Sequence, residues 1–242
     1  MFTLPIGFII LLGALFASVK MESWPLFFNY HAIVIVVVGS LGVLSLTTPS
    51  SILKALYRSI IELFHKGMSI HDHLEEFKNL SQNTPLATRS KNELINYYNE
   101  VWQQGLSSEL KQSLLLQKRE VIENRRIEAI QTLKQLSKYP PALGMTGTVV
   151  GLVSLFSTLG NDDASQIGPA LALAMTATFF GLALTNFFIN PLADRLHVEF
   201  MKEKKKLLGI YQILSLINQG DPEAVIINEV NHRENEATEK AA

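Results

Sequence analysis

Four long apolar stretches dominate the pattern of hydrophobic and polar positions along the chain. They cover residues 2–19, 27–46, 142–159 and 167–189. At the rise of an α-helix, each stretch is close to the length that crosses the ~30 Å hydrocarbon core of a bilayer. The first stretch lacks the basic start and the cleavage site of a signal peptide, so we interpret it as a retained helix. The pattern therefore predicts four transmembrane helices arranged in two hairpins.

Positive charge lies almost entirely between and after these hairpins. Residues 48–139 and 194–242 contain nearly all of the Lys and Arg, whereas the turn at 160–166 contains none. Because cytoplasmic loops are enriched in these residues, both regions and both termini are expected in the cytoplasm. The predicted fold class is an all-α polytopic membrane protein with four transmembrane helices. Its predicted parts are a transmembrane hairpin at 1–47, a cytoplasmic helical domain at 48–139, a second hairpin at 140–192, and a cytoplasmic C-terminal helix and tail at 193–242.

Apolar residues recur at helical spacing in two parts of the predicted cytoplasmic domain. The weaker pattern covers 52–64, and the stronger covers 106–136, most of which is expected to run as a stiff rod into the third apolar stretch. Thr84-Pro85 interrupts the middle, because proline lacks the amide proton that a helix interior needs. The acidic tail from Asp221 loses the apolar period, and we expect it to be partly disordered. Four lysines after the fourth stretch suit anchoring to anionic membrane lipid: Lys202, Lys204, Lys205 and Lys206.

Composition argues against several classes of function. The chain has 242 residues, and its 21 Lys and Arg nearly balance its 22 Asp and Glu, so no overall basic field indicates a nucleic-acid partner. It has no cysteine, which excludes disulfides, thiolate metal sites and cysteine nucleophiles. His65, His71 and His73 match no metal-ligand spacing, and no phosphate-binding loop, nucleophile elbow or paired-carboxylate site occurs. We therefore expect no enzymatic activity, no resident metal and no cofactor.

Small residues form a stripe at three- and four-residue spacing on each of the last two apolar stretches. The third stretch carries Gly144, Gly147, Gly151 and Ser154, and the fourth carries Ala170, Ala174, Thr178 and Gly181. Small side chains allow two helices to approach closely in a bilayer, where packing rather than hydrophobicity drives association. Such stripes are typical both of packing within one chain and of packing around a partner helix, and the pattern leaves both open.

The same two stretches contain no ionisable side chain. Neither 142–159 nor 167–192 has an Asp, Glu, Lys, Arg or His, although an ion path through hydrocarbon normally needs such a group. A partner would therefore have to supply the carboxylate. The chain itself offers hydroxyl groups: Thr146, Thr148, Ser154, Thr176, Thr178 and Thr185. Hydroxyl and backbone oxygens can line a hydrated path or bind a hard cation such as sodium, although a threonine in a membrane helix also bonds to its own backbone.

The second hairpin carries a resemblance to a known family. It reads PPALGMTGTVVGLV at 140–153, followed by Asn161-Asp-Asp163, Ile167-Gly-Pro169 and Asn190-Pro-Leu-Ala-Asp194. These motifs closely resemble the MotA/PomA family of stator subunits of the bacterial flagellar motor, within the wider group that includes TolQ and ExbB. The match is strong from about 139 to 195. Four predicted spans and a large cytoplasmic insert extend it over the whole chain.

The resemblance implies a multi-pass protein of the bacterial inner membrane that converts sodium or proton flow into torque for flagellar rotation. It implies a pentamer around a MotB-like single-span subunit, whose Asp is the missing carboxylate, and a contact with a FliG-like rotor protein. By residue matching, Pro141 and Pro191 fall on functional prolines of the family, and Thr148 and Thr178 fall on positions associated with the choice of ion. A threonine at position 148 favours sodium.

Two features keep alternatives open. The prolines are explained either as helix punctuation or as a hinge. Where the family has a charged rotor-facing helix, this sequence reads Thr84-Pro85, and the nearest charged candidates for a rotor contact are Lys78, Arg89, Lys91 and Glu93. An ordinary solvated face also explains these charges. An energy-transducing channel subunit of the ExbB/TolQ or gliding type, acting on a non-flagellar partner, and a membrane scaffold without ion passage remain alternative functions.

Overall fold

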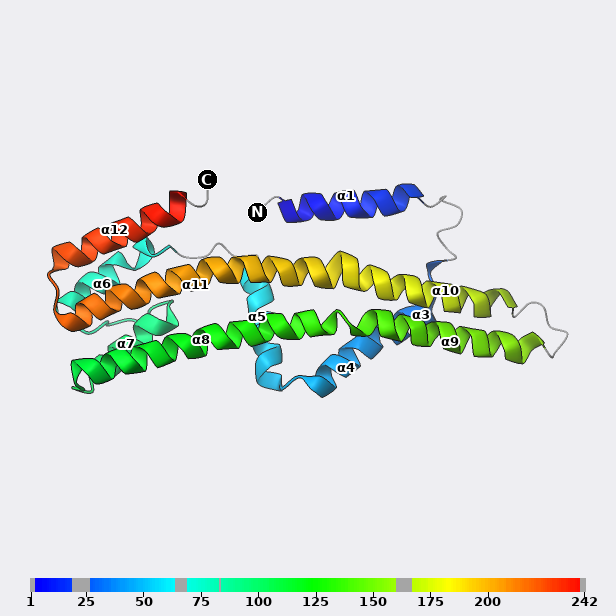
Figure 1. Cartoon of the computed structure of the whole chain (residues 1–242), viewed down its shortest axis with the longest axis horizontal. Helices are drawn as coiled ribbons and strands as arrows, with labels where there is room; N and C mark the ends of the chain where they lie inside the picture. Colours follow the sequence, from blue (N-terminus) through cyan, green and yellow to red (C-terminus); the bar gives the residue numbers. More distant parts are fainter. Residues whose placement is uncertain (1–2, 19–26, 64–68, 83, 160–166, 240–242) are drawn as a thin grey trace. The chain divides into compact units, whose positions relative to one another are not determined.

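A computed structural model of the chain describes residues 3–18, 27–63, 69–82, 84–159 and 167–239 (Figure 1). Across these residues the backbone forms helices and turns, and no strand occurs among them, which confirms the all-α fold class. The predicted turn at 160–166, with its Asn161-Asp-Asp163 motif, and His65 lie outside the described residues. The chain divides into two compact units, which are described separately: residues 1–56 with 129–195, and residues 57–128 with 196–242.

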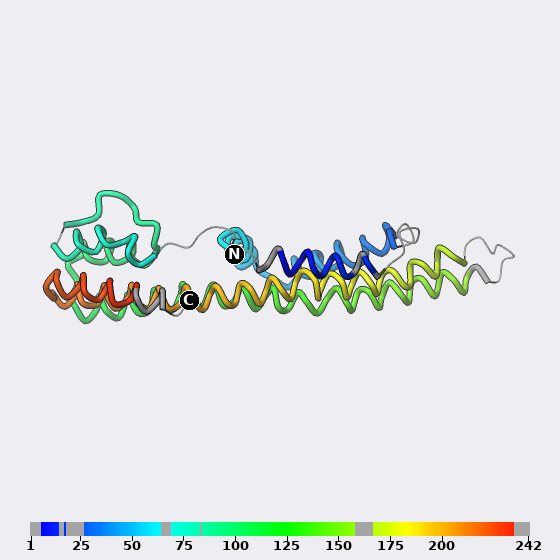
Figure 2. Tube along the Cα trace, turned by 90° about the horizontal axis from the view of Figure 1, so that it is seen from above, coloured from blue at the N-terminus to red at the C-terminus, as the bar shows by residue number. Residues whose placement is uncertain are grey.

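The first unit contains the apolar helices. Helix α1 spans Thr3–Ser18, and a second helical stretch runs through α3 (Tyr30–Ile33), the π-helical turn η2 (Val34–Val38) and α4 (Gly39–Thr47). Helix α9 spans Tyr139–Leu159, and α10 (Ile167–Ala183) continues through the π-helical turn η5 (Leu184–Ile189) into α11 (Asn190–Gln219). Helices α9 and α10 lie side by side in both views (Figures 1 and 2).

Three helical stretches are long and apolar enough to cross a membrane by length and composition: Tyr30–Thr47, Ser108–Ser157 and Ile167–Gln219. They contain the second, third and fourth of the predicted spans. Helix α1 is also apolar, but its 16 residues correspond to only about 24 Å of helix, which is shorter than the hydrocarbon core. The chain is therefore a membrane-embedded helical protein with three such stretches among its described residues.

The prolines at the two helix junctions differ in their effect. Helix α8 ends at Leu136 and α9 begins at Tyr139, so Pro140 and Pro141 lie in the first turn of a new helix, where a missing amide proton costs little. The predicted rod into the third span is thus interrupted by a turn. Pro191, in contrast, does not end its helix, because α11 continues to Gln219. The π-helical turn η5 immediately before it provides the irregular hydrogen bonding that a proline within a helix requires.

The second unit is a helical domain around its own apolar core. It contains the second half of α5 (Ser50–Leu63), η3 (His71–His73), α6 (Leu74–Ser81), α7 (Glu93–Trp102), the larger parts of α8 (Ser108–Leu136) and α11, and α12 (Glu223–Glu239). The core consists of residues at helical spacing on these elements: Ile70, Phe77, Leu80, Leu94, Ile95, Tyr98, Leu115, Ile210, Ile213, Leu214, Ile217, Ile226 and Val230.

Helix α12 contradicts the expectation of a partly disordered tail. Ile226 and Val230 are four residues apart and therefore lie on one face of this helix, and both are completely buried in the core of the second unit. The Glu234 carboxylate also accepts a hydrogen bond from the Ser69 hydroxyl. The acidic composition concealed this pattern, because two well-placed apolar side chains are enough to hold the helix against the domain.

Candidate ion-pathway hairpin

The small residues of α9 and α10 pack the two helices directly against each other. Gly144, Gly147, Gly151 and Gly181 are all buried. A Cβ atom at Gly144 would lie 2.8 Å from the carbonyl oxygen of Ala177, and one at Gly151 would lie 2.7 Å from the amide nitrogen of Ala174. A real Cβ atom essentially never comes this close to a backbone atom, so only glycine fits without a shift of the backbone. The glycine stripe and Ala174 therefore serve helix packing within the chain.

The proline turn closes one end of this contact. A Cβ atom at Gly181 would overlap the carbonyl oxygen of Pro140 and would lie 3.2 Å from the Cα atom of Pro141. Thr185 fixes the same end, because its buried hydroxyl donates to the carbonyl oxygen of Ser137 at 3.0 Å. The sequence pattern had identified Thr185 only as one of several hydroxyls in the hairpin. The start of α9 is therefore fastened to the fourth apolar stretch by both backbone contact and a hydrogen bond.

Thr148 and Thr178 meet in the middle of the α9–α10 contact. Their Oγ1 atoms are 2.6 Å apart, and Thr148 Oγ1 also lies 3.0 Å from the carbonyl oxygen of Ala174 and 3.2 Å from that of Gly144. Thr178 Oγ1 lies 3.4 Å from the Gly144 carbonyl oxygen as well. Because Gly144 has no side chain, its carbonyl is accessible from the facing helix. We name these four oxygen atoms, two hydroxyl and two carbonyl, the threonine cluster.

Two other threonine hydroxyls of the hairpin make hydrogen bonds only within their own helix. Thr146 donates to the carbonyl oxygen of Ala142 and Thr176 to that of Ala172, each one turn earlier on its own helix. This is how a threonine in a membrane helix ordinarily satisfies its hydroxyl. Ser154, on the predicted small-residue stripe, is exposed. Unlike Thr146 and Thr176, the hydroxyls of the threonine cluster therefore make hydrogen bonds to the facing helix.

The threonine cluster contains only neutral oxygen atoms. Oxygen ligands of this kind suit hard cations, but they do not replace a carboxylate as a carrier of protons. Pro141 lies one turn before Gly144 on the same face of α9, so it borders the cluster. Pro191 is exposed and lies ten residues beyond Gly181, about 15 Å along the helix. Within the described residues, no group of three or more His, Cys, Asp or Glu side chains is placed to hold a metal ion.

Opposite the glycine stripe, α9 presents an apolar face that the chain itself leaves exposed. The side chains recur at intervals of three or four residues: Met145, Val149, Val153 and Phe156. Each is at least 60% exposed. In a membrane protein, such a face contacts lipid or another helix.

The candidate rotor-contact residues lie in the second unit and are not equivalent. The Lys78 ammonium pairs with Glu75 at 3.1 Å, and Glu93 pairs with Lys118 at 2.8 Å and with Arg125 at 3.6 Å. Arg89 and Lys91 are exposed on the connection between α6 and α7. Thr84-Pro85 lies on the same connection, at the predicted helix interruption.

The ion pairs of Glu93 predict an acid-sensitive contribution to stability. Burial alone would raise the pKa of Glu93, but the hydrogen bond from Lys118 and the charges of Lys118, Arg125 and Arg58 lower it below its ordinary value of 4.5. The stabilisation is therefore complete above that value and is lost as the pH falls through the lower pKa of the folded state. Lys118→Met should reduce the loss of thermal stability between about pH 7 and about pH 3.5, whereas Lys91→Met should not. The effect should be small because the pair is partly exposed. Equal melting profiles for wild type and Lys118→Met in detergent would contradict it.

Comparison with known proteins places this helical hairpin in a family. The model of the MotA/TolQ/ExbB proton channel family matches residues 81–209, which include α9, α10 and the threonine cluster. This match covers more than half of the chain, and the chain belongs to the MotA/TolQ/ExbB proton channel family.

Relatives and solved structures agree with this assignment. Motility protein A of Treponema pallidum (strain Nichols) is 28% identical over 211 residues, which are 82% of this chain and 80% of the relative. Chemotaxis protein PomA of Vibrio alginolyticus is 38% identical over 74 residues, which are 31% of this chain and 28% of the relative. The flagellar MotAB stator complex from Bacillus subtilis contains a chain of the same fold, with a TM-score of 0.72, 22% identity, and coverage of 93% of this chain and 92% of that chain. C. jejuni MotAB gives a TM-score of 0.71 at 17% identity, covering 96% of each chain.

Proposed function

We propose that this chain is the stator subunit of an ion-driven flagellar motor, in which it forms half of an ion channel and converts sodium or proton flow into torque. One observation carries the proposal: a closely packed hairpin that brings hydroxyl and carbonyl oxygens together and whose two apolar stretches, 142–159 and 167–192, contain no ionisable residue. Membership of a proton channel family and similarity to Motility protein A over most of the chain support it. Because the relatives named above are motility and chemotaxis proteins, an energy-transducing subunit acting on a non-flagellar partner is not favoured.

The missing carboxylate would come from a MotB-like partner with a single membrane helix that carries an Asp. The solved relatives of this fold are MotAB complexes, which supports such a partner. We further propose that the chain assembles as a pentamer around it. The exposed apolar face of α9 supports an assembly in which that face packs against another helix instead of lipid.

We propose four membrane spans, with both termini in the cytoplasm of a bacterium and the protein in its inner membrane. Two spans separate residues 48–139 from residues 194–242, so both Lys- and Arg-rich regions lie on the cytoplasmic side with either three or four spans. A fourth span at residues 2–19 would bring the N-terminus to that side as well. Helix α1 is short, but the ring of Phe8 packs edge-on against that of Phe188 in η5 at 4.9 Å. This contact supports α1 lying beside the fourth apolar stretch within the membrane.

The threonine cluster supports sodium as the transported ion. Sodium binds several neutral oxygen atoms at once, and the cluster brings two hydroxyls and two carbonyls from facing helices together. A proton needs no such set of ligands. Pro141 would border this path from the cytoplasmic end of α9, and Pro191 would act further along the fourth stretch.

For the contact with a FliG-like rotor protein, we propose Arg89 and Lys91 as the principal residues. Both are exposed, whereas Glu93 and Lys78 already have partners within the second unit. Lys78 and Glu93 would then border the contact without making its strongest pairs.

The function is tested by complementation. Expressed together with a single-span partner that carries the membrane Asp, the chain should restore swimming to a flagellated host that lacks its own stator. The same pair with the partner's Asp changed to Asn should assemble in the membrane without restoring swimming, because the ion carrier is lost. A pair that reaches the membrane as a complex but never restores swimming, in either sodium-rich or sodium-poor medium, would contradict the proposal.

A further inference from the structure

The connection between α6 and α7 is basic and is held in one conformation. Residues 84–92 contain no Asp or Glu, and Arg89 and Lys91 both expose their side chains. Between them, Ser90 is only 7% exposed. At the other end, the Leu86 amide donates to the Asn99 side-chain oxygen at 3.1 Å, and Leu86 packs against the core of the second unit. The connection is therefore attached at both ends, with its two cations directed outward.

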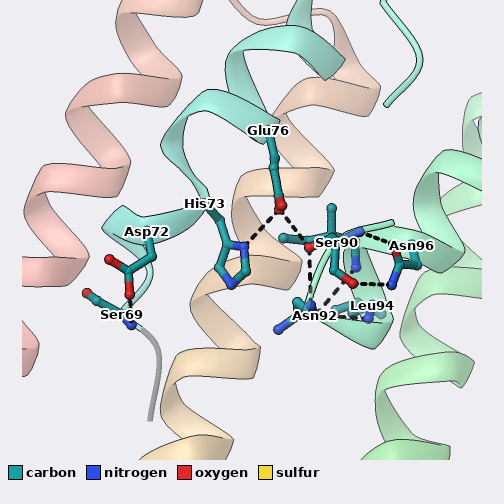
Figure 3. Close-up of polar contacts among 9 residues, drawn as sticks. Ser69, Asp72, His73, Glu76, Ser90, Asn92, Leu94 and Asn96 are labelled. Atoms are coloured by element: carbon teal, nitrogen blue, oxygen red, sulfur yellow. Dashed lines mark hydrogen bonds and ion pairs between the residues drawn. The ribbon is translucent and has the colours of Figure 1, made fainter. Parts of the chain in front are cut away.

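Every polar group of Ser90 has a partner. Its amide donates to Asn96 Oδ1 at 2.7 Å, and its carbonyl oxygen accepts from Asn96 Nδ2 at 2.7 Å, so the Asn96 amide pairs with the backbone of Ser90 on both sides. The Ser90 hydroxyl accepts from the Asn92 amide at 3.1 Å and donates to Glu76 Oε2 at 2.7 Å. Figure 3 shows these side chains converging on Ser90 from α6 and α7. Ser90 therefore cannot rotate without breaking several hydrogen bonds at once.

Glu76 is the group on which this arrangement depends. Its Oε2 atom accepts from the Ser90 hydroxyl and also lies 2.8 Å from Nδ1 of His73, which is 2% exposed (Figure 3). Because a carboxylate only accepts hydrogen bonds, His73 must carry its proton on Nδ1. One carboxylate oxygen on α6 thus connects a buried histidine to the basic connection. Hydrogen bonds to a charged acceptor are about twice as strong as neutral ones.

The direction of the two cations follows from the position of Ser90. Ser90 is buried while its two neighbours, Arg89 and Lys91, are exposed, so the hydrogen bonds that fix Ser90 also fix the backbone that carries the two cations. Two long side chains on a mobile loop would have to be ordered when they bind, whereas a fixed backbone removes part of that cost. Arg89 and Lys91 are both exposed, and residues 84–92 contain no Asp or Glu that could neutralise them. The connection is therefore complementary in charge to an acidic protein surface.

We propose that Glu76 is a positioning residue, which through Ser90 holds Arg89 and Lys91 in the geometry that docks onto an acidic face of the rotor protein. This inference rests on the proposed stator function. It assigns the contact to a preformed loop between helices and makes the affinity of that contact depend on the half-buried Glu76 carboxylate beneath the loop.

Amide hydrogen exchange, measured on the full-length chain with its partner subunit, tests whether Glu76 holds the segment around Ser90 in place. Glu76→Ala should speed exchange at the Ser90 and Asn92 amides by about tenfold or more, because the hydroxyl that holds this segment loses its charged acceptor. Glu76→Gln keeps an oxygen in the same place and should change exchange much less. Ser90→Ala leaves the His73–Glu76 contact intact and should reproduce the effect of Glu76→Ala at Asn92. Unchanged exchange in both alanine variants would overturn the proposal.

Swimming of the complemented host tests whether Glu76 acts on the rotor contact through Arg89 and Lys91, by a double-mutant comparison. Reversing both charges, by Arg89→Glu together with Lys91→Glu, should slow swimming strongly. Glu76→Ala alone should also slow swimming, although the complex still reaches the membrane. Added to the double reversal, Glu76→Ala should cause no further loss, because it acts only through those cations. Additive losses, or normal swimming of Glu76→Ala, would overturn the positioning role. Failure of the wild-type chain to restore swimming would instead reject the stator function itself.

Discussion

Gly181→Val should prevent stable folding of the second hairpin. The Cβ atom of any larger residue would overlap the carbonyl oxygen of Pro140, and backbone atoms cannot move aside as a flexible side chain can. Inserting atoms into a well-packed core typically costs about 1–3 kcal/mol, and a clash with backbone should reach at least the upper end of that range. The variant should therefore show little full-length protein in the membrane, a lower melting temperature in detergent and no swimming.

Gly168→Val is the matched control for this prediction. Gly168 lies on the same helix, but no atom lies within 4 Å of the position where its Cβ would be. The two variants introduce the same side chain into α10, so they compare the same added atoms with and without a backbone contact. Normal abundance and melting of Gly181→Val, alongside a normal Gly168→Val, would contradict the direct contact between the proline turn and the fourth apolar stretch.

Thr148→Val should change ion dependence far more than stability. Valine keeps the volume of threonine but removes the hydroxyl that links Thr178, Gly144 and Ala174. A hydrogen bond between membrane helices contributes only about 0.6–2 kcal/mol, so the protein should remain folded. The threonine cluster, however, loses its central oxygen. The sodium concentration that gives half-maximal swimming speed should rise by about tenfold, which corresponds to about 1.4 kcal/mol of lost ion binding.

Two variants make this result specific. Thr148→Ser keeps the hydroxyl and should swim with nearly normal sodium dependence. Thr146→Val removes a hydroxyl from the same helix that bonds only to its own backbone, and should leave the dependence unchanged. If Thr148→Val and Thr146→Val behave alike, the threonine cluster is a packing feature, and the membrane-scaffold alternative regains support.

The sequence predicted the apolar hairpin well because its pattern is local. Glycines spaced along one face of α9 must lie on the same side of a helix, and the structure places Gly144, Gly147 and Gly151 against the fourth stretch. Gly181, on the fourth stretch, lies against Pro140 and Pro141. The threonine pair was named from the resemblance to the family. Its hydrogen bonds were not predictable from spacing, because the relative register of the two helices decides which hydroxyls meet.

Other features depend on contacts between segments distant in the sequence, and the sequence did not reveal them. The bond from Thr185 to the Ser137 carbonyl joins residues 48 positions apart, and no local pattern marks it. Glu93 looked available for a rotor, but helix α8 supplies Lys118 and Arg125 as its partners. The connection at 84–92 read as a simple interruption. Its fixed shape comes from hydrogen bonds to Glu76, Asn96 and Asn99 on the neighbouring helices.

Ion flux through proteoliposomes tests most directly whether this chain forms half of an ion channel. Vesicles that contain the chain alone should show no sodium or proton flux above background, since neither of the two packed apolar stretches has an ionisable group. Vesicles that contain the chain with its single-span, Asp-bearing partner should conduct the ion, and Thr148→Val in that complex should reduce sodium flux. Specific flux through the chain alone, or no flux through the complete complex, would contradict the proposal that the chain forms half of a channel and that the partner supplies the carboxylate.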